Sequence, residues 1–257
     1  ARRRRNLRVE TGAHATRIRL RDGRAVAVDY LRGGRTQAAS ARAEVILAAG
    51  AIASPLLLQH SGIGPGALLA GLGIPVLHDR PAVGENLQDH LCIDHLYRAR
   101  QPTLNQQLGG WWGRMQAGVR YLALRRGPLA ISVNQAGGFV RAGPNAPVLQ
   151  LYFSPLSYTR APPGVRALLR PDRFPGFLLS AQPCRPTSRG HLRAVSPNPL
   201  AAPAITPNSL ATAEDVAAML AASRFLRRLA ATPPLAARIA EELKPGPAAQ
   251  TDAALLA

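Results

Sequence analysis

The stretch that decides the fold is AEVILAAGAIASPLLLQHSGIGP, residues 43–65, in which two apolar runs flank a cluster of very small side chains. The first run, residues 45–49, is continuously apolar, which is typical of a strand buried on both faces of a parallel sheet. After it, Ser54 is a good N-cap and Pro55 is a good first helical residue. The stretch therefore predicts a buried strand, a bare turn and a short helix that starts at Pro55.

The bare turn, formed by Ala49, Gly50 and Ala51, leaves its backbone open to close approach. A helix N-terminus that follows such a turn presents free N–H groups and the positive end of the helix dipole. This geometry accepts a phosphate or another part of a nucleotide cofactor. The alternative is tight packing of the helix on the strand with no ligand, and this segment alone leaves both interpretations open.

Upstream of this stretch, residues 16–41 predict an antiparallel meander of three strands. Apolar residues alternate with polar ones, and the turns fall at Asp22-Gly23 and at Gly33-Gly34. The meander followed by a buried strand predicts an α/β fold, with part of a Rossmann-like, doubly wound sheet.

Downstream, three helical patterns are visible, over residues 66–73, 113–126 and 212–230. The last is the clearest, because Thr212 and Asp215 approximate a capping box at its start. In the middle pattern the apolar positions are Met115, Val119, Leu122 and Leu124.

From about residue 129 the sequence has a different character. Short apolar runs such as VLQLYF and GFLLSAQP are separated by joints rich in proline and glycine. This pattern predicts an antiparallel sheet in a second, α+β domain.

Composition narrows the class of protein. The net charge is +18 over 257 residues, but the arginines are scattered apart from RRRR at 2–5, and aromatic residues make up only 5%. The chain therefore lacks the features of a nucleic-acid-binding surface, and we expect no nucleic-acid partner. Cys92 and Cys184 have no metal-ligand spacing, so no metal site is predicted. With no leader and no membrane-length apolar run, we expect a cytoplasmic protein, which leaves membrane association of the full-length protein open.

The two ends predict a fragment of a longer protein. The chain begins without methionine, and Thr251 has the character of an N-cap for a helix that has barely begun at the last residue.

Five segments resemble the glucose–methanol–choline (GMC) family of flavin oxidoreductases, and they follow the family's order. They are NLRVETGAHATRI (6–18), GAIASPLLLQHSGIG (50–64), GIPVLHDRPAVGENLQDH (73–90), NQAGGFVR (134–141) and RPTSRGHLRAVSPNPLAAPAITPN (185–208). One departure is Pro-Ala-Val-Gly at 81–84, where Pro-Gly-Val-Gly is more usual in the family.

The resemblance implies an FAD-binding Rossmann-like domain beside a substrate domain with an antiparallel sheet. It implies oxidation of an alcohol by hydride transfer to flavin. The domains expected are a partial FAD-binding domain at 1–95, a substrate domain at 96–210 and a truncated C-terminal helical segment at 211–257.

The family's N-terminal Gly-x-Gly-x-x-Gly is not found in this sequence, and its catalytic histidine is expected beyond residue 257. No catalytic residue is therefore predicted within the chain, and the chain alone is expected to be inactive. None of the six histidines has a visible partner that would make it a base, and His95 and His191 have no visible context at all.

The resemblance also implies binding residues. The backbone of His14 and Ala15 matches a contact to the adenine of FAD, although valine is more usual at Ala15. Asn86 and His90 belong to NLQDH, which in the family packs near the flavin, and His90 is given no catalytic role. The remaining matches are the turn against the FAD, at Ala49, Gly50, Ala51 and Ser54, and the substrate-side residues Asn134 and Gln135.

The expected substrate is a small alcohol. Within the family the chain resembles choline dehydrogenases, but choline-specific relatives carry an acid near Gln135, and its absence favours a neutral alcohol. The electron acceptor and the oligomeric state stay open. The alternatives are a lyase or a light-driven decarboxylase of the same fold, or a basic binding protein without enzyme activity.

Overall fold

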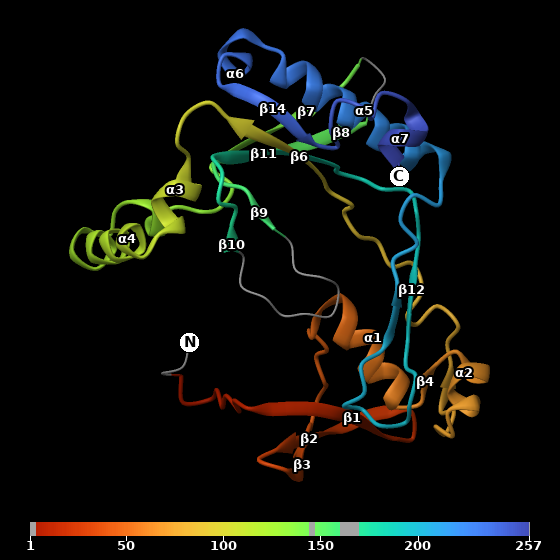
Figure 1. The fold of residues 1–257 in the computed structure, drawn as a ribbon. Coiled ribbons are helices and arrows are strands. Elements are labelled where there is room, and N and C mark those ends of the chain that lie inside the picture. The colour runs from red at the N-terminus through yellow and green to blue at the C-terminus, as the bar shows by residue number, and fades with distance from the viewer. Residues whose placement is uncertain (1–3, 144–146, 160–169, 257) are drawn as a thin grey trace. The chain divides into compact units, whose positions relative to one another are not determined.

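The chain forms two compact units in the computed structural model (Figure 1). Unit 1 contains the residues up to Gln88 together with Ser188–Ser209, and unit 2 contains Asp89–Thr187 and the residues from Leu210 onward. The structure describes residues 4–143, 147–159 and 170–256.

The units differ from the predicted domains in where Ser188–Ser209 belongs. The prediction put this segment in the substrate domain, whereas its contacts are with unit 1. The physical reason is a set of backbone pairings, in which the N–H of Leu192 donates to Gly84 O and the N–H of Gly190 donates to Leu87 O. Residues from Leu210 onward, predicted as a separate segment, belong to unit 2.

Unit 1 is built from a three-stranded antiparallel sheet, in the order β1-β2-β3, together with two helices and short paired strands. The sheet confirms the predicted meander, with turns at the two predicted dipeptides. Its elements are β1 (Ala13–Arg21), β2 (Arg24–Arg32), β3 (Arg35–Ser40), α1 (Gly50–His60), β4 (Ile63–Gly64), α2 (Gly66–Gly71), β5 (His78–Asp79), β12 (His191–Arg193) and β13 (Ala204–Thr206).

The second meander turn depends on glycine. Gly33 and Gly34 have φ of 55° and 76°, the pair of positive values that a two-residue hairpin turn requires. Replacing Gly34 with alanine is expected to lower the free energy of unfolding by about 1–2 kcal/mol, because a Cβ disfavours this backbone conformation. No atom lies within 4 Å of the added Cβ, so the effect is conformational and not steric. Urea denaturation measures it, with Gly71→Ala in α2 as the control that should not destabilise.

The predicted buried strand at residues 45–49 is wrong. This segment has no regular secondary structure, and the Ile46 side chain is 79% exposed. A strand needs a hydrogen-bonded neighbour, and no strand in the described ranges pairs with this segment. The apolar composition of residues 45–49 indicated burial, but it could not show whether a neighbouring strand is present to pair with them.

The predicted start of α1 is also wrong. The helix begins at Gly50 and contains Pro55 in its second turn. Ser54 is not the N-cap, because its Oγ lies inside the helix and accepts a hydrogen bond from the N–H of Ala49 at 3.1 Å. This backward bond holds the turn together, so the helix can start before the proline.

Unit 2 is built around a five-stranded antiparallel sheet in the order β14-β6-β11-β8-β7, which confirms the predicted antiparallel sheet (Figure 1). The two predicted strand sequences are β8 and β11, and they pair directly. Its elements are β6 (Ile93–Ala99), α3 (Leu104–Gly109), α4 (Trp111–Leu124), the 3-10 helix η1 (Pro128–Ala130), β7 (Ala136–Arg141), β8 (Val148–Ser154), β9 (Tyr158–Thr159), β10 (Arg170–Pro171), β11 (Gly176–Pro183), α5 (Ala213–Ala230), α6 (Pro233–Ala236), β14 (Ile239–Lys244) and α7 (Asp252–Leu256).

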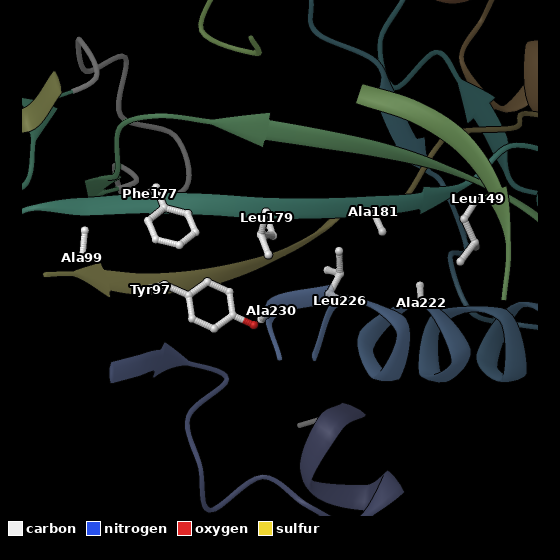
Figure 2. Packing of buried hydrophobic residues seen from close by; sticks show 9 residues of the cluster. All are labelled: Tyr97, Ala99, Leu149, Phe177, Leu179, Ala181, Ala222, Leu226 and Ala230. Carbon is white, nitrogen blue, oxygen red and sulfur yellow. The ribbon is translucent and has the colours of Figure 1, made fainter. Parts of the chain in front are cut away.

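The core of unit 2 lies between the sheet and α5. Figure 2 shows Leu226 and Ala222 of α5 pointing toward Leu179 and Ala181 of β11, with Tyr97 of β6 beside them. The predicted N-cap of α5 is confirmed, since Thr212 Oγ1 accepts from the N–H of Asp215 at 3.3 Å. One face of the sheet is thereby sealed with apolar side chains, and alternation along the strands places different residues on the other face.

Candidate functional site

The face of the sheet opposite α5 is polar. Ser180 of β11 lies directly across from Asp94 of β6 on one side and from Tyr152 of β8 on the other. Two residues along β11, Gln182 lies across from Gln150 of β8. Directly paired residues point to the same side of a sheet, so these five polar side chains form one surface, here called the polar face.

His90 is held against the polar face by both of its ring nitrogens. Nε2 lies 3.0 Å from the carbonyl oxygen of Cys184, and a carbonyl only accepts, so Nε2 carries the proton. Nδ1 then accepts a hydrogen bond from Gln182 Nε2 at 3.1 Å. The same amide group donates to Gln150 Oε1 at 3.1 Å. The network fixes the orientation of the ring, and both ring nitrogens are engaged in hydrogen bonds.

Asn134 and Gln135 lie beside the polar face, just before β7. Ser154 Oγ donates to Asn134 Oδ1 at 2.7 Å, and the N–H of Gln135 donates to Phe153 O at 2.8 Å. The Gln135 amide also donates to Ser132 O. Both side chains are exposed, so unit 2 brings Asn134, Gln135 and His90 onto one sheet surface with groups that can still meet a ligand.

The polar face contains residues that the sequence analysis missed. Ser180 Oγ donates to Asp94 Oδ1 at 2.6 Å, which places a carboxylate on the surface. Burial raises the pKa of Tyr152, with the nearby Cys92 and Cys184 acting in the same direction, so its hydroxyl stays protonated at neutral pH. The signal was present in VLQLYFS, where Gln150, Tyr152 and Ser154 alternate with apolar residues.

The small-residue turn in unit 1 is open to close approach. Ala49, Gly50 and Ala51 are exposed, and no heavy atom lies within 4 Å of a Cβ built on Gly50, whose φ is +88°. α1 has no side-chain cap, so the N–H groups of its first turn lack helical partners. Bare backbone, free N–H groups and the positive end of the helix suit part of a nucleotide cofactor such as FAD.

The other predicted cofactor residues lie elsewhere in unit 1. His14 and Ala15 are exposed on β1, opposite Leu31 and Tyr30 of β2. The hydrogen bond between β1 and α1 is made at the far end of the helix, where Ser61 Oγ accepts from the N–H of Ile18 at 2.8 Å.

Asn86 lies in the loop after β5, exposed, with a positive φ of 63°. It is in unit 1, whereas His90 is in unit 2. The NLQDH segment, in which both lie, thus spans the boundary between the units.

Two features are not found in the part of the chain that the structure describes. There, no three His, Cys, Asp or Glu side chains are grouped so that they could hold a metal ion. None of the helices in the same ranges combines the length and apolarity that crossing a bilayer requires.

Comparison with known proteins identifies the class. The models for the GMC oxidoreductase family match residues 1–92 and 186–257, which together make up more than half of the chain. The chain is 39% identical over 256 residues to the oxygen-dependent choline dehydrogenase of Serratia proteamaculans. It therefore belongs to the GMC oxidoreductase family.

Solved structures agree with this assignment. Pyridoxine 4-oxidase from Mesorbium loti matches with a TM-score of 0.78 and 25% identity, covering 99% of this chain and 45% of that one. Formate oxidase from Aspergillus oryzae RIB40, a structure concerned with modification of FAD, matches with a TM-score of 0.82 over 95% of this chain and 47% of that one. At 22% identity, this second likeness shows the fold alone.

The chain spans less than half the length of the relatives that it matches. The Serratia alignment covers 98% of this chain but 45% of that enzyme.

Proposed function

We propose that this chain forms part of an FAD-dependent enzyme that oxidises a small neutral alcohol. The observation that carries the proposal is the polar face, where His90, Gln182 and Gln150 form a fixed hydrogen-bond network and where Ser154, further along β8, holds the exposed Asn134. A surface that offers amide and hydroxyl groups on a rigid sheet suits the recognition of a hydroxyl compound.

The two units contribute different parts of this function. In unit 1, the turn at Ala49, Gly50, Ala51 and Ser54 would hold part of FAD against bare backbone, and the backbone of β1 at His14 and Ala15 would contact the adenine. When bound, FAD supplies the acceptor for the hydride that leaves the alcohol carbon.

In unit 2, the residues of the polar face bind and orient the alcohol. Tyr152 can donate a hydrogen bond to the substrate oxygen, because its hydroxyl stays protonated. Asn134 offers an amide at the edge of the surface, and His90 keeps the Gln182 amide in place. Asp94 is already hydrogen-bonded by Ser180 and anchors the surface.

The proposed substrate class follows from the absence of an acidic residue next to Gln135 in the sequence. No carboxylate adjoins it in sequence, unlike the choline-specific relatives, which carry an acid near this position. We therefore propose a neutral alcohol and not a cationic one, a small-molecule partner, and no nucleic acid. We also propose that residues 1–257 alone neither retain FAD tightly nor turn over.

The test uses protein expressed from the complete open reading frame that encodes residues 1–257. Tyr152→Phe and Gln182→Leu are each expected to slow alcohol-dependent bleaching of the flavin by about tenfold, the effect of one lost hydrogen bond to the substrate or its support. Anaerobic stopped-flow absorbance measures the rate, and the visible flavin spectrum measures the FAD content, which should not change.

The control is Gln37→Leu, which alters an exposed glutamine on β3 of unit 1. Unchanged rates of flavin bleaching in both polar-face variants would contradict the assignment of the polar face as the substrate-binding surface. A folded protein without flavin would contradict the cofactor, and faster reduction by choline than by neutral alcohols would contradict the substrate class. Flavin that no alcohol reduces would favour the lyase or decarboxylase alternatives.

A further inference from the structure

Two cysteines extend the polar face at one end of the sheet. Cys92 lies two residues before Asp94 in the chain, and Cys184 lies two residues after Gln182. Because side chains alternate along an extended chain, both cysteines lie on the same side of the sheet as these polar residues. The N–H of Cys184 donates to Val148 O at 3.0 Å, so the pairing of β11 with β8 continues as far as Cys184. Both cysteines are partly exposed.

The two thiols differ in what they contact. The Cys92 thiol donates to Ile93 O at 3.6 Å and to Asp94 Oδ1 at 3.9 Å, so oxygen acceptors hold its proton. The backbone of Cys184 is fixed by the bond from its N–H and by His90, which lies 3.0 Å from its carbonyl oxygen. Within the described ranges, no hydrogen bond involves the Cys184 thiol. Cys184 is therefore a positioned sulfur nucleophile that has no hydrogen bond to break before it reacts.

The Tyr152 hydroxyl lies within electrostatic reach of both thiols. Burial is the main cause that raises the pKa of Tyr152, and the charges that Cys92 and Cys184 carry when ionised raise it further. A hydrogen bond with the Gln182 side chain acts in the opposite direction, and it directs the hydroxyl along the sheet toward Cys184. Cys184 thus has near it a hydrogen-bond donor that stays protonated at neutral pH.

We propose that Cys184 reversibly captures the aldehyde that oxidation of a primary alcohol forms on the polar face, an inference that rests on the proposed function. The Tyr152 hydroxyl, which that function assigns to the substrate oxygen, donates to the same oxygen in the product. The sulfur forms a bond to the carbonyl carbon, the carbonyl π electrons move to the oxygen, and the thiol proton is transferred to that oxygen. The result is a hemithioacetal, and its formation requires no oxidant.

A disulfide is the other reaction open to two thiols on one surface, and the strand register disfavours it. Ala181 lies across from Ile93, so Cys92 is across from Gln182 and Cys184 is its diagonal neighbour. Diagonal neighbours on adjacent strands are about 7–8 Å apart, whereas the Cβ atoms of a disulfide are about 3.8 Å apart. Addition to a carbonyl needs one thiol and no movement of the strands.

Capture makes the aldehyde an inhibitor of its own formation, because an adduct at Cys184 occupies the space of the next alcohol beside Tyr152. A ketone accepts a thiol much less readily, since its carbonyl carbon carries two carbon substituents. Primary alcohols should therefore show stronger product inhibition than secondary alcohols.

The test uses protein expressed from the complete open reading frame and the unsaturated aldehyde acrolein as the probe. Conjugate addition to acrolein leaves a stable label, because the sulfur bonds to the β-carbon and the thiol proton ends on the α-carbon. Tandem mass spectrometry of peptides is expected to find the label on Cys184 and not on Cys92. Butanal should protect Cys184 from the label, and butan-2-one should not.

The Tyr152 hydroxyl distinguishes a carbonyl site from a thiol that is merely accessible. Tyr152→Phe should slow acrolein labelling of Cys184 by about tenfold, the effect of one lost hydrogen bond to the carbonyl oxygen. The rate with methyl methanethiosulfonate, which reacts with thiols but has no carbonyl group, should not change. Cys92→Ser is the matched control and should leave the labelling of Cys184 unchanged.

Three results would each overturn the proposal: no acrolein label on Cys184, equal labelling of Cys92 and Cys184, or equal slowing of both reagents by Tyr152→Phe. In stopped-flow measurements, butanal should inhibit alcohol-dependent bleaching of the flavin more strongly in the parent protein than in Cys184→Ser, and equal inhibition would also overturn it. Labelling requires no turnover. A label on Cys184 in a protein whose flavin no alcohol reduces would contradict the proposed function, and with it the source of the aldehyde, but would support the carbonyl site.

Discussion

Replacing Gln59 with leucine is expected to lower the free energy of unfolding of unit 1 by about 3–5 kcal/mol. Gln59 is fully buried in α1, and both the nitrogen and the oxygen of its side-chain amide form hydrogen bonds with backbone groups. Its Nε2 donates to Val83 O at 3.1 Å and to Leu192 O at 3.2 Å, and its Oε1 accepts from the N–H of Ala194 at 2.7 Å. Leucine keeps the approximate volume but deprives three backbone groups of a partner, at about 1–3 kcal/mol for each one left unpaired.

The effect should be local to the segments that Gln59 joins. Hydrogen–deuterium exchange is expected to rise in the peptides that contain Val83 and Leu192, and urea denaturation gives the change in stability. Gln37→Leu is the matched control, because Gln37 is exposed and accepts a single hydrogen bond, from Tyr30. A loss no larger than that of the control would show that Gln59 does not hold Ser188–Ser209 to unit 1.

This link also shows what the sequence could not predict. Gln59 and Leu192 are 133 residues apart, and neither carries a local signal that the other is its partner. The return of Ser188–Ser209 to unit 1 depends on such distant bonds, so the expected boundary between the domains at 1–95 and 96–210 missed it.

Local signals were sufficient where the structure is decided by neighbours in sequence. The meander follows from dipeptides such as Gly33-Gly34, whose backbone conformation selects a two-residue turn. The start of α5 follows from Thr212, which satisfies a free N–H of the first turn. Both features depend on residues no more than a few positions apart.

Long-range pairing decided the predictions that failed or were incomplete. Residues 45–49 are apolar enough for a buried strand, but apolarity cannot supply the neighbouring strand, and Ile46 is exposed. In the candidate site, the alternation within β8 was visible in the sequence. The sequence alone could not predict the strand register, which places Ser180 between Asp94 and Tyr152 and so forms the polar face.

The stability of unit 2 is expected to depend on pH through His95. This residue is 2% exposed in the core, with Nε2 2.9 Å from Ser223 Oγ and Nδ1 3.3 Å from Tyr97 Oη. Burial lowers the pKa of His95 from 6.5 to about 4, with the charge of Glu242 opposing the shift and that of Arg227 adding to it. Burial also raises the pKa of Tyr97, so this partner remains neutral throughout.

The direction of the effect follows from which state binds the proton more tightly. The unfolded chain protonates His95 near pH 6.5, whereas the folded unit resists protonation until about pH 4. The stabilisation of unit 2 by neutral His95 is therefore complete above pH 6.5 and is lost as pH falls from 6.5 to 4, by about 3 kcal/mol in all.

His95→Gln should flatten the dependence of the free energy of unfolding on pH across this window, whatever its effect at neutral pH. Urea denaturation at several pH values measures the slope, with His14→Gln on exposed β1 as the control. Burial also lowers the pKa of His60 in unit 1, but this residue is present in both the parent protein and the His95→Gln variant, so its effect on the slope is the same in each. An unchanged slope in His95→Gln would therefore show that His95 is not the group through which acid destabilises the fold.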